Sequence, residues 1–276
     1  MIKIIDLDKI FDKYIGSYVY KNVGKIKPEE IEDHIPVMYE EFGNEKLSDL
    51  NGKTPNEYYK DFPAGELVSA LKEHIFSGVP VSDFLLEAII AAKDAEKFVL
   101  LGLKTEENEE LLSYLLTVYE LAGFNKGTGE ILGFVIYDYS ENLREHATEI
   151  LSKTADSVKD AVLEVFDGAD DSKKENLAEI LSNCKKDDRV LDVLSAEFLR
   201  RKDKIAQYAG YLSKYGDERA LPLLLSAIED EKIRYADFTE LRFAIESLGG
   251  EYEKERDFKN DKDYGKIKGV KKNKII

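Results

Sequence analysis

Histidine and clustered carboxylates are the side chains that could bind a metal, and their spacing does not fit a metal site. The three histidines, His34, His74 and His146, are widely separated along the chain. No His-Glu-x-x-His and no Cys-x-x-Cys motif occurs, although these spacings let short segments hold zinc. Glu141 and Glu145 lie one helical turn apart beside His146, but acidic pairs at this spacing are common on solvated helix faces. We therefore expect no metal site.

Residues that could act as nucleophiles or hold phosphate also lack the required context. No Gly-x-Ser-x-Gly motif occurs, and Cys184 shares an apolar helical stripe with Leu177 and Leu181, which predicts a buried and inert thiol. Residues 127–129, Gly-Thr-Gly, precede a predicted helix and follow no strand, which predicts a turn rather than a phosphate-binding loop. We expect no catalytic residue and no cofactor.

Charge narrows the choice of partner. The 276 residues include 40 Lys and Arg against 56 Asp and Glu, so the formal net charge is −16. Residues 251–276 hold nine basic and six acidic side chains, which leaves −19 on residues 1–250. Such an acidic body repels phosphate backbones, so we expect no nucleic-acid partner. Most acidic clusters fall at predicted turns and helix starts, where carboxylates stabilise helix N-termini without any ligand.

The compartment follows from cysteine use and hydropathy. A single cysteine cannot form an internal disulfide, which is typical of a reducing compartment. The first residues, Met-Ile-Lys-Ile-Ile-Asp-Leu-Asp, meet charge before a signal-peptide core develops, and no stretch approaches the ~20 apolar residues of a membrane span. We expect a cytoplasmic, soluble protein with no membrane partner.

Apolar residues at helical spacing must position any functional side chain, because strand patterns are scarce. Each apolar stripe predicts a helix of about ten to fifteen residues that needs a neighbour to bury it. Hydrophobic residues make up 43% of the chain, enough for a core. The clearest stripes are Val158, Ala161, Val162 and Val165; Leu177, Ile180, Leu181 and Cys184; Ile205, Tyr208, Ala209 and Leu212; and Leu221, Leu224, Leu225 and Ile228.

These helices repeat at a nearly constant period. Residues that end predicted first helices recur at intervals of 30, 31 and 36 in the second half, and two weaker positions extend the series backwards. Such a period predicts a helix-turn-helix unit repeated about five times from near residue 82. The recurring positions are Ile90, Leu121, Leu151, Leu181, Leu212 and Leu248.

The run from Leu212 to Leu224, LSKYGDERALPLL, carries a family resemblance. It resembles a HEAT-like repeat, in which one helix ends at Leu-x-x-x-Gly-Asp and the next opens with Ala-Leu-Pro-x-Leu. The resemblance is strongest over residues 203–250 and weaker over 64–202, where the repeats lack both the Gly-Asp and the Pro. Gly216 can adopt the left-handed conformation that ends the first helix, and Asp217 can cap the second. The resemblance implies an all-α, right-handed α-solenoid of HEAT-like helix pairs.

Three regions follow from this pattern. Residues 1–62 do not fit the period and predict an irregular helical N-terminal cap, in which Thr54-Pro55-Asn56-Glu57 should open a short helix. Residues 63–250 form the predicted solenoid. Residues 251–276 form a charged and flexible tail, whose last part, from Tyr264 to Ile276, has five lysines and no acid. We expect the tail to lie against the acidic body or to serve as a contact arm.

A solenoid of this kind has a concave face lined by the second helices, where a partner can bind. No exposed column keeps one sign or one aromatic through three repeats, so the sequence does not support a code of one contact per repeat. The candidate partner-binding residues are carboxylates of the second helices and an aromatic segment before them. They are Asp160, Glu164, Asp192, Glu197, Phe124, Phe134, Tyr137 and Tyr139.

Two functions remain open. The first is a non-enzymatic scaffold or adaptor that binds a protein or peptide, and its partner should be basic because an acidic surface attracts it. The second is an enzyme, or a regulatory subunit of one, that uses the groove as a lyase-like pocket. Some HEAT-like proteins are similar in fold and act as chromophore lyases or DNA glycosylases, but the acidic body and the absence of Trp disfavour this function.

Overall fold

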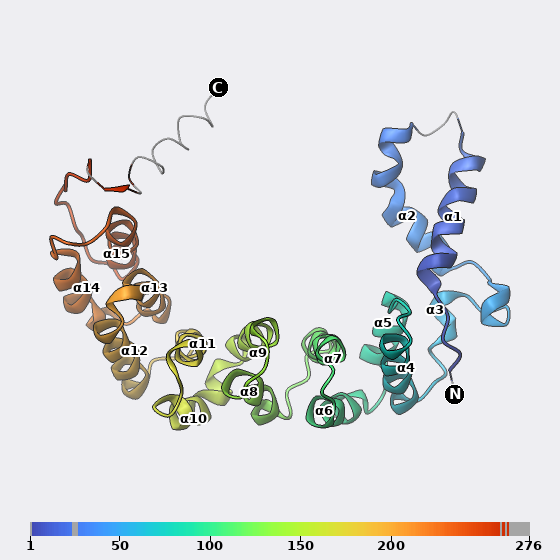
Figure 1. The fold of residues 1–276 in the computed structure, drawn as a ribbon, viewed down its shortest axis with the longest axis horizontal. Coiled ribbons are helices and arrows are strands. Elements are labelled where there is room, and N and C mark those ends of the chain that lie inside the picture. Colours follow the sequence, from blue (N-terminus) through green and yellow to red (C-terminus); the bar gives the residue numbers. More distant parts are fainter. Residues whose placement is uncertain (1, 24–26, 260, 263, 265–276) are drawn as a thin grey trace. The chain divides into compact units, whose positions relative to one another are not determined.

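A computed structural model describes residues 2–23, 27–259, 261, 262 and 264 (Figure 1). Within those residues the chain forms fifteen α-helices and four short 3₁₀ turns, with no β-strand. This confirms the all-α prediction. No helix in the described part of the chain combines the length and the apolar character that crossing a membrane requires.

The chain divides into two compact units, residues 1–130 and 131–276, which are called unit 1 and unit 2 below. The boundaries expected after residues 62 and 250 stay predictions. Unit 1 contains α1 (Leu7–Lys21), α2 (Ile31–Gly43), α3 (Pro55–Tyr58), α4 (Ala64–Phe76), α5 (Asp83–Ala91), α6 (Ala95–Thr105) and α7 (Glu109–Leu121). Helix α8 (Thr128–Ile136) crosses the division. Unit 2 contains α9 (Glu141–Lys153), α10 (Ala155–Phe166), α11 (Asp171–Leu181), α12 (Asp188–Arg200), α13 (Ile205–Tyr215), α14 (Leu221–Ile228) and α15 (Tyr235–Ser247).

Aromatic side chains hold the first helices of unit 1 together. The ring of Phe42 is fully buried and lies 5.2 Å from that of Phe11 and 6.2 Å from that of Phe84, measured between centroids. Tyr39 stacks on Phe84 at 5.0 Å. Helices α1, α2 and α5 therefore share one aromatic cluster, and α4 packs against α5, α6 and α7 beside it. Helix α3 begins at Pro55, as predicted.

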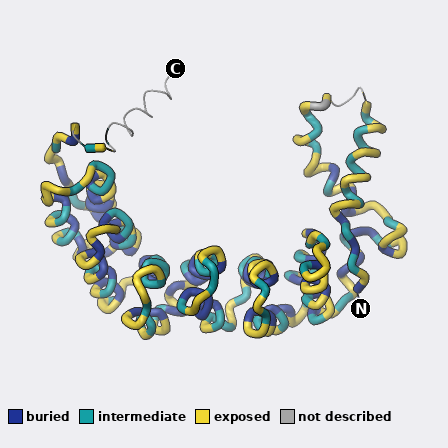
Figure 2. Tube along the Cα trace, in the orientation of Figure 1, coloured by how far each residue is buried: buried dark blue, intermediate teal, exposed yellow. Residues whose placement is uncertain are grey.

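Unit 2 alternates its helices between two rows. Helices α9, α11, α13 and α15 pack against one another in sequence, while α10 contacts α9 and α11, and α12 contacts α11 and α13. Figure 2 shows buried and exposed positions alternating around these helices, as expected when each has one apolar stripe. The predicted stripe of Leu177, Ile180, Leu181 and Cys184 is buried. Burial raises the pKa of the Cys184 thiol to about 11, in keeping with the predicted inert thiol.

The turn between α13 and α14 forms as its sequence predicts. Gly216 has a φ of +75° and its N–H donates to the carbonyl of Leu212 at 3.1 Å, which ends α13. The Asp217 carboxylate accepts a hydrogen bond of 3.1 Å from the N–H of Arg219 and so caps the following turn. A side chain at residue 216 would be strained in this left-handed conformation.

The first part of the expected tail is packed against the last helices. Residues 251–259 and 261, called the C-terminal strap, place Tyr252 and Phe258 against the ring of Phe238 on α15, at centroid distances of 5.9 and 5.0 Å. Tyr252 and Phe258 are each only 8% exposed. The strap thus covers the end of unit 2. The lysine-rich segment from residue 265 onward lies outside the described residues.

The strap also forms hydrogen bonds with backbone groups at the end of α14 and the start of α15. The Arg256 guanidinium donates to the carbonyls of Ile228 (2.9 Å) and Asp230 (2.6 Å), where α14 ends. The Asp261 carboxylate accepts from the N–H of Tyr235 (3.1 Å), the first residue of α15. Helix α15 has no capping side chain at its own N-cap residue, so Asp261 supplies that cap from a distant part of the sequence.

Candidate functional site

A polar groove of about 260 Å³ lies along the row of α9, α11 and α13 in unit 2. Three helices contribute to it because their exposed faces lie side by side. The groove contains five carboxylates and one guanidinium among its lining side chains. The lining residues are Glu141, Arg144, Glu145, Thr148, Glu149, Ser172, Glu175, Asn176, Glu179, Gln207 and Tyr211.

Helical spacing explains why the glutamates gather. Glu141, Glu145 and Glu149 follow one another at four-residue steps on α9, and Glu175 and Glu179 do so on α11. Residues four apart lie on the same face of a helix. The other face of α9 is apolar and packs against α10 and α11, so its polar face is left to the groove.

Most of these carboxylates lack a cation. Glu175 accepts from Arg201 at 2.9 Å and lies 3.3 Å from the Lys204 ammonium. By contrast, the other four glutamates form no ion pair with any residue that the structure describes; they are Glu141, Glu145, Glu149 and Glu179. Four carboxylates therefore line the groove without an ion-pair partner among the described residues.

The one guanidinium in the lining is directed to neutral groups. Arg144 donates from Nη1 to the Ser172 hydroxyl (3.1 Å) and from Nη2 to the carbonyl of Tyr139 (3.2 Å). Its Nε is buried and has no hydrogen-bond partner in the described part of the chain. Arg144 thus links α9 to α11 without forming an ion pair with the groove glutamates.

Tyr211 and Gln207 form the edge of the groove on α13. The Gln207 amide donates to the Tyr211 hydroxyl at 2.8 Å. Burial, together with the carboxylates of Glu179 and Glu175, raises the pKa of Tyr211 to about 12, so the phenol stays protonated at neutral pH. Its neutral ring offers a flat surface on which a cationic side chain can rest.

The carboxylates predicted to bind a partner lie on the other row, on α10 and α12. Asp160 accepts from Arg189 at 2.9 Å. Glu197 is 6% exposed and accepts from Arg200 at 2.6 Å. Glu164 and Asp192 are exposed. The structure therefore does not bring these four residues into the polar groove, and two of them already have cationic partners.

The predicted aromatic segment is also divided. Phe124 belongs to unit 1, where its ring meets Tyr119 at 6.0 Å. In unit 2, Phe134 is 1% exposed and packs on Tyr139 at 4.4 Å, which are core contacts. Tyr137 is 64% exposed, whereas Phe124 and Tyr139 are partly buried.

The sequence analysis did not predict the groove. It compared exposed positions on the second helix of each repeat, whereas the groove lies on the first helices, α9, α11 and α13. A signal was present, since the pair Glu145 and Glu149 on α9 recurs as Glu175 and Glu179 on α11 at the repeat spacing. Reading the exposed columns of the first helices would have found it.

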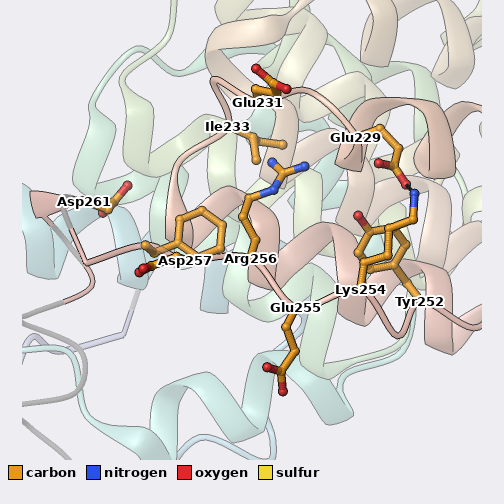
Figure 3. A pocket seen from close by; sticks show the side chains of 10 residues that line it. Glu229, Glu231, Ile233, Tyr252, Lys254, Glu255, Arg256, Asp257 and Asp261 are labelled. Carbon is orange, nitrogen blue, oxygen red and sulfur yellow. Dashed lines mark hydrogen bonds and ion pairs between the residues drawn. The ribbon is translucent and has the colours of Figure 1, made fainter.

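A second hollow, of about 570 Å³, lies between the C-terminal strap and the α14–α15 loop (Figure 3). The Lys254 ammonium meets the Glu229 carboxylate there at 2.5 Å. Arg256 points toward the loop, where it donates to backbone carbonyls. Lys254 and Arg256 thus already bind groups of the chain itself. This hollow therefore has fewer charged side chains without a partner than the polar groove has.

In the described part of the chain, no three His, Cys, Asp or Glu side chains are arranged to hold a metal ion. Comparison of the chain with known protein families, with curated proteins and with solved structures finds no significant match.

Proposed function

We propose that unit 2 binds a basic, extended segment of a protein or peptide in the polar groove, and that the chain is a non-enzymatic scaffold or adaptor. The observation that carries this proposal is the set of four glutamates without cationic partners among the described residues, on α9 and α11. Lysine or arginine side chains in the groove would supply the missing charges.

The architecture we propose for it is a right-handed α-solenoid of HEAT-like pairs. Support comes from the nearly constant period of the sequence and from the two rows of helices within unit 2. In such an array one row forms a continuous face, and an extended segment can follow it across several helices. The groove-bearing row in this proposal is that of the first helices.

Binding of a labelled octalysine peptide, followed by fluorescence anisotropy, tests the proposal. Replacing Glu145, Glu149 and Glu179 with Gln should weaken binding about tenfold or more, because three uncompensated charges are lost. Affinity for the wild-type chain should fall as salt rises.

A matched control separates groove binding from general attraction to an acidic protein. The triple variant Glu164→Gln, Asp192→Asn and Glu218→Gln removes the same charge from exposed positions outside the groove. It should bind the peptide nearly as the wild type does. Equal weakening by both triple variants would refute the groove, and stronger weakening by the control would favour the second-helix carboxylates instead.

A further inference from the structure

Unit 1 contains an apolar hollow that the proposed function does not use. It lies where the link before α4, the C-terminal end of α5 and the N-terminal end of α6 meet, and its volume is about 670 Å³. Sites for small organic ligands have volumes of about 300–1,000 Å³. We call it the alanine pocket; it is lined by Lys60, Asp61, Phe62, Pro63, Ala64, Ala88, Ala91, Ala92, Lys93, Asp94 and Phe98.

Small side chains create the space and aromatic rings bound it. Ala88, Ala91 and Ala92 present only methyl groups toward the hollow from the end of α5. Phe62 and Phe98 supply ring surface, and neither is fully buried by the chain itself. A ligand with an aromatic or branched apolar group would bury this surface, and removing apolar surface from water favours binding.

The wall formed by Phe98 is held in place by a glycine. A Cβ atom at Gly65 would lie 2.9 Å from Cε1 of Phe98, closer than real contacts allow. The ring of Phe98 therefore packs directly on the backbone at the start of α4. This arrangement indicates a preformed wall rather than a side chain free to collapse into the hollow.

The backbone beside the pocket is unusual. Asp94 has a φ of +63°, in the left-handed region that residues other than glycine seldom occupy. Its carboxylate does not cap α6, so capping does not account for the conformation. The turn at Asp94 leads from α5 into α6 and sets Lys93 and Asp94 among the lining residues. Residues in such conformations cluster at binding sites.

Charge at the rim runs opposite to that of the whole chain. Lys60 and Lys93 are exposed and form no ion pair with any described residue. Lys97 adds a third cation, 5.6 Å above the ring of Phe98. On the acidic side, Asp61 is paired with Lys53 at 2.8 Å, and this contact lowers the pKa of Asp61.

Of the two acidic lining residues, Asp94 is the one that forms no ion pair with a described residue. The lining contains two lysines without an ion pair, Lys60 and Lys93. In a chain whose formal charge is −16, this is a local basic rim around an apolar hollow. Such a combination fits a ligand that is apolar at one end and anionic at the other.

We propose that the alanine pocket binds a small organic acid, with its aromatic or branched apolar group between Phe62 and Phe98 and its carboxylate beside Lys60 and Lys93. This site is independent of the polar groove, which lies in unit 2 and selects the opposite charge.

The test uses a matched pair of probes, 2-naphthylacetate and its neutral amide 2-naphthylacetamide, with the full-length chain. The chain has no tryptophan, so naphthalene fluorescence anisotropy reports binding without interference from indole. Alanine methyl groups labelled with ¹³C report the location, and the signals of Ala88, Ala91 and Ala92 should shift on titration. The acid should bind more tightly than the amide.

Two variants divide the proposal into its parts. Lys60→Gln with Lys93→Gln should weaken binding of the acid roughly threefold to tenfold and leave the amide unchanged, since exposed ion pairs contribute modestly. Ala91→Leu should abolish binding of both probes because its side chain fills the hollow. Residue 91 is exposed, so unchanged helical circular dichroism and an unchanged unfolding midpoint should confirm that this variant folds.

The control is Lys46→Gln with Lys214→Gln, which removes the same charge at exposed lysines outside the pocket. Equal loss of acid binding in this control overturns the role of the rim lysines. Wild-type affinity in folded Ala91→Leu, or equal affinity of the wild type for acid and amide, overturns the site.

Discussion

The two units stabilise the contacts between their helices by different means. In unit 1, helices α1, α2 and α5 meet through the rings of Phe11, Tyr39, Phe42 and Phe84. In unit 2, carboxylates and guanidinium groups one repeat apart in the sequence join successive helix pairs. Unit 1 also has ion pairs near this spacing, such as Lys72–Glu106 and Glu96–Lys126, but they involve α4, α6 and the residues after α6 and α7.

The charged links of unit 2 begin with two equivalent Asp-x-Arg turns. In each, the Asp carboxylate accepts from the backbone N–H and from the guanidinium of the Arg two positions later. The first turn pairs Asp187 with Arg189, and the second, one repeat further along the chain, pairs Asp217 with Arg219.

Each Arg then reaches the preceding helix pair. Arg189 donates to Asp160 at 2.9 Å, and Arg219 donates to Asp188 at 2.7 Å. Each guanidinium therefore contacts two carboxylates. One is the Asp that caps the turn to which the Arg belongs, and the other lies on the preceding helix pair. The comparison shows two ways to join helices. Helices α1, α2 and α5 do not follow the repeat and meet through aromatic rings, whereas the repeated pairs of unit 2 use the same polar contact twice.

The largest predicted effect removes the aromatic cluster. Phe42→Ala should lower the free energy of unfolding by about 3–5 kcal/mol, because a fully buried ring leaves a cavity. Urea unfolding at low and at high salt should give the same loss. Tyr20→Ala, at a residue 82% exposed, is the control and should change stability by less than about 0.5 kcal/mol. A loss for Phe42→Ala that depends on salt would contradict the aromatic account.

The next effect removes one Asp-x-Arg turn. Asp217→Ala should cost about 1–2 kcal/mol, as loss of a capping carboxylate does. Hydrogen–deuterium exchange should show faster exchange in α13 and α14 and unchanged exchange in unit 1. Glu218→Ala changes an exposed neighbour and should leave exchange as it is. Faster exchange in unit 1 as well would show that the contact is not local to unit 2.

The same carboxylate gives a pH dependence of known sign. The hydrogen bond from Arg219 lowers the pKa of Asp217 to about 2, whereas an unfolded aspartate has a pKa of about 3.9. Because the folded value is the lower one, its stabilisation is present above about pH 4 and is lost as pH falls through about 2. The stability difference between wild type and Asp217→Asn, from urea midpoints at pH 5, 4, 3 and 2, should therefore shrink with acid. A difference that stays constant would contradict the prediction.

The smallest effect concerns the far end of the same link. Asp188 is exposed, with 82% of its side chain accessible, so its ion pair with Arg219 is screened by solvent. Asp188→Ala should cost about 0.5 kcal/mol or less in urea unfolding, and about 0.5 M salt should remove the difference. A larger and salt-resistant loss would mean that the contacts between repeats, rather than the cap, dominate in unit 2.

Local chemistry made much of unit 2 predictable from sequence. The left-handed Gly216 and the capping Asp217 follow from residue types at a helix junction. Burial of the stripe around Cys184 follows from helical periodicity. These features depend on residues within a few positions of one another, so one sequence contains the whole signal.

Features that join distant segments were not predictable in this way. The C-terminal strap binds the backbone carbonyls of Ile228 and Asp230. Every residue has such a carbonyl, so residue types do not indicate which ones are bound. The polar groove depends on which row of helices presents its polar face. Glu145 and Glu149 recur as Glu175 and Glu179 at the same step as Leu151 to Leu181, so the period contains the repeated pair, but it does not show that these faces form a groove.

The strap also sets an order of events during synthesis. Helices α14 and α15 are complete by residue 247, yet the group that caps α15 arrives only with Asp261. At ribosomal rates of about 5–20 residues per second, the 26 residues from Tyr235 to Asp261 take roughly 1–5 s to add. Until the strap has packed, the ring of Phe238 and the N-terminal end of α15 lack the contacts that cover them in the folded chain.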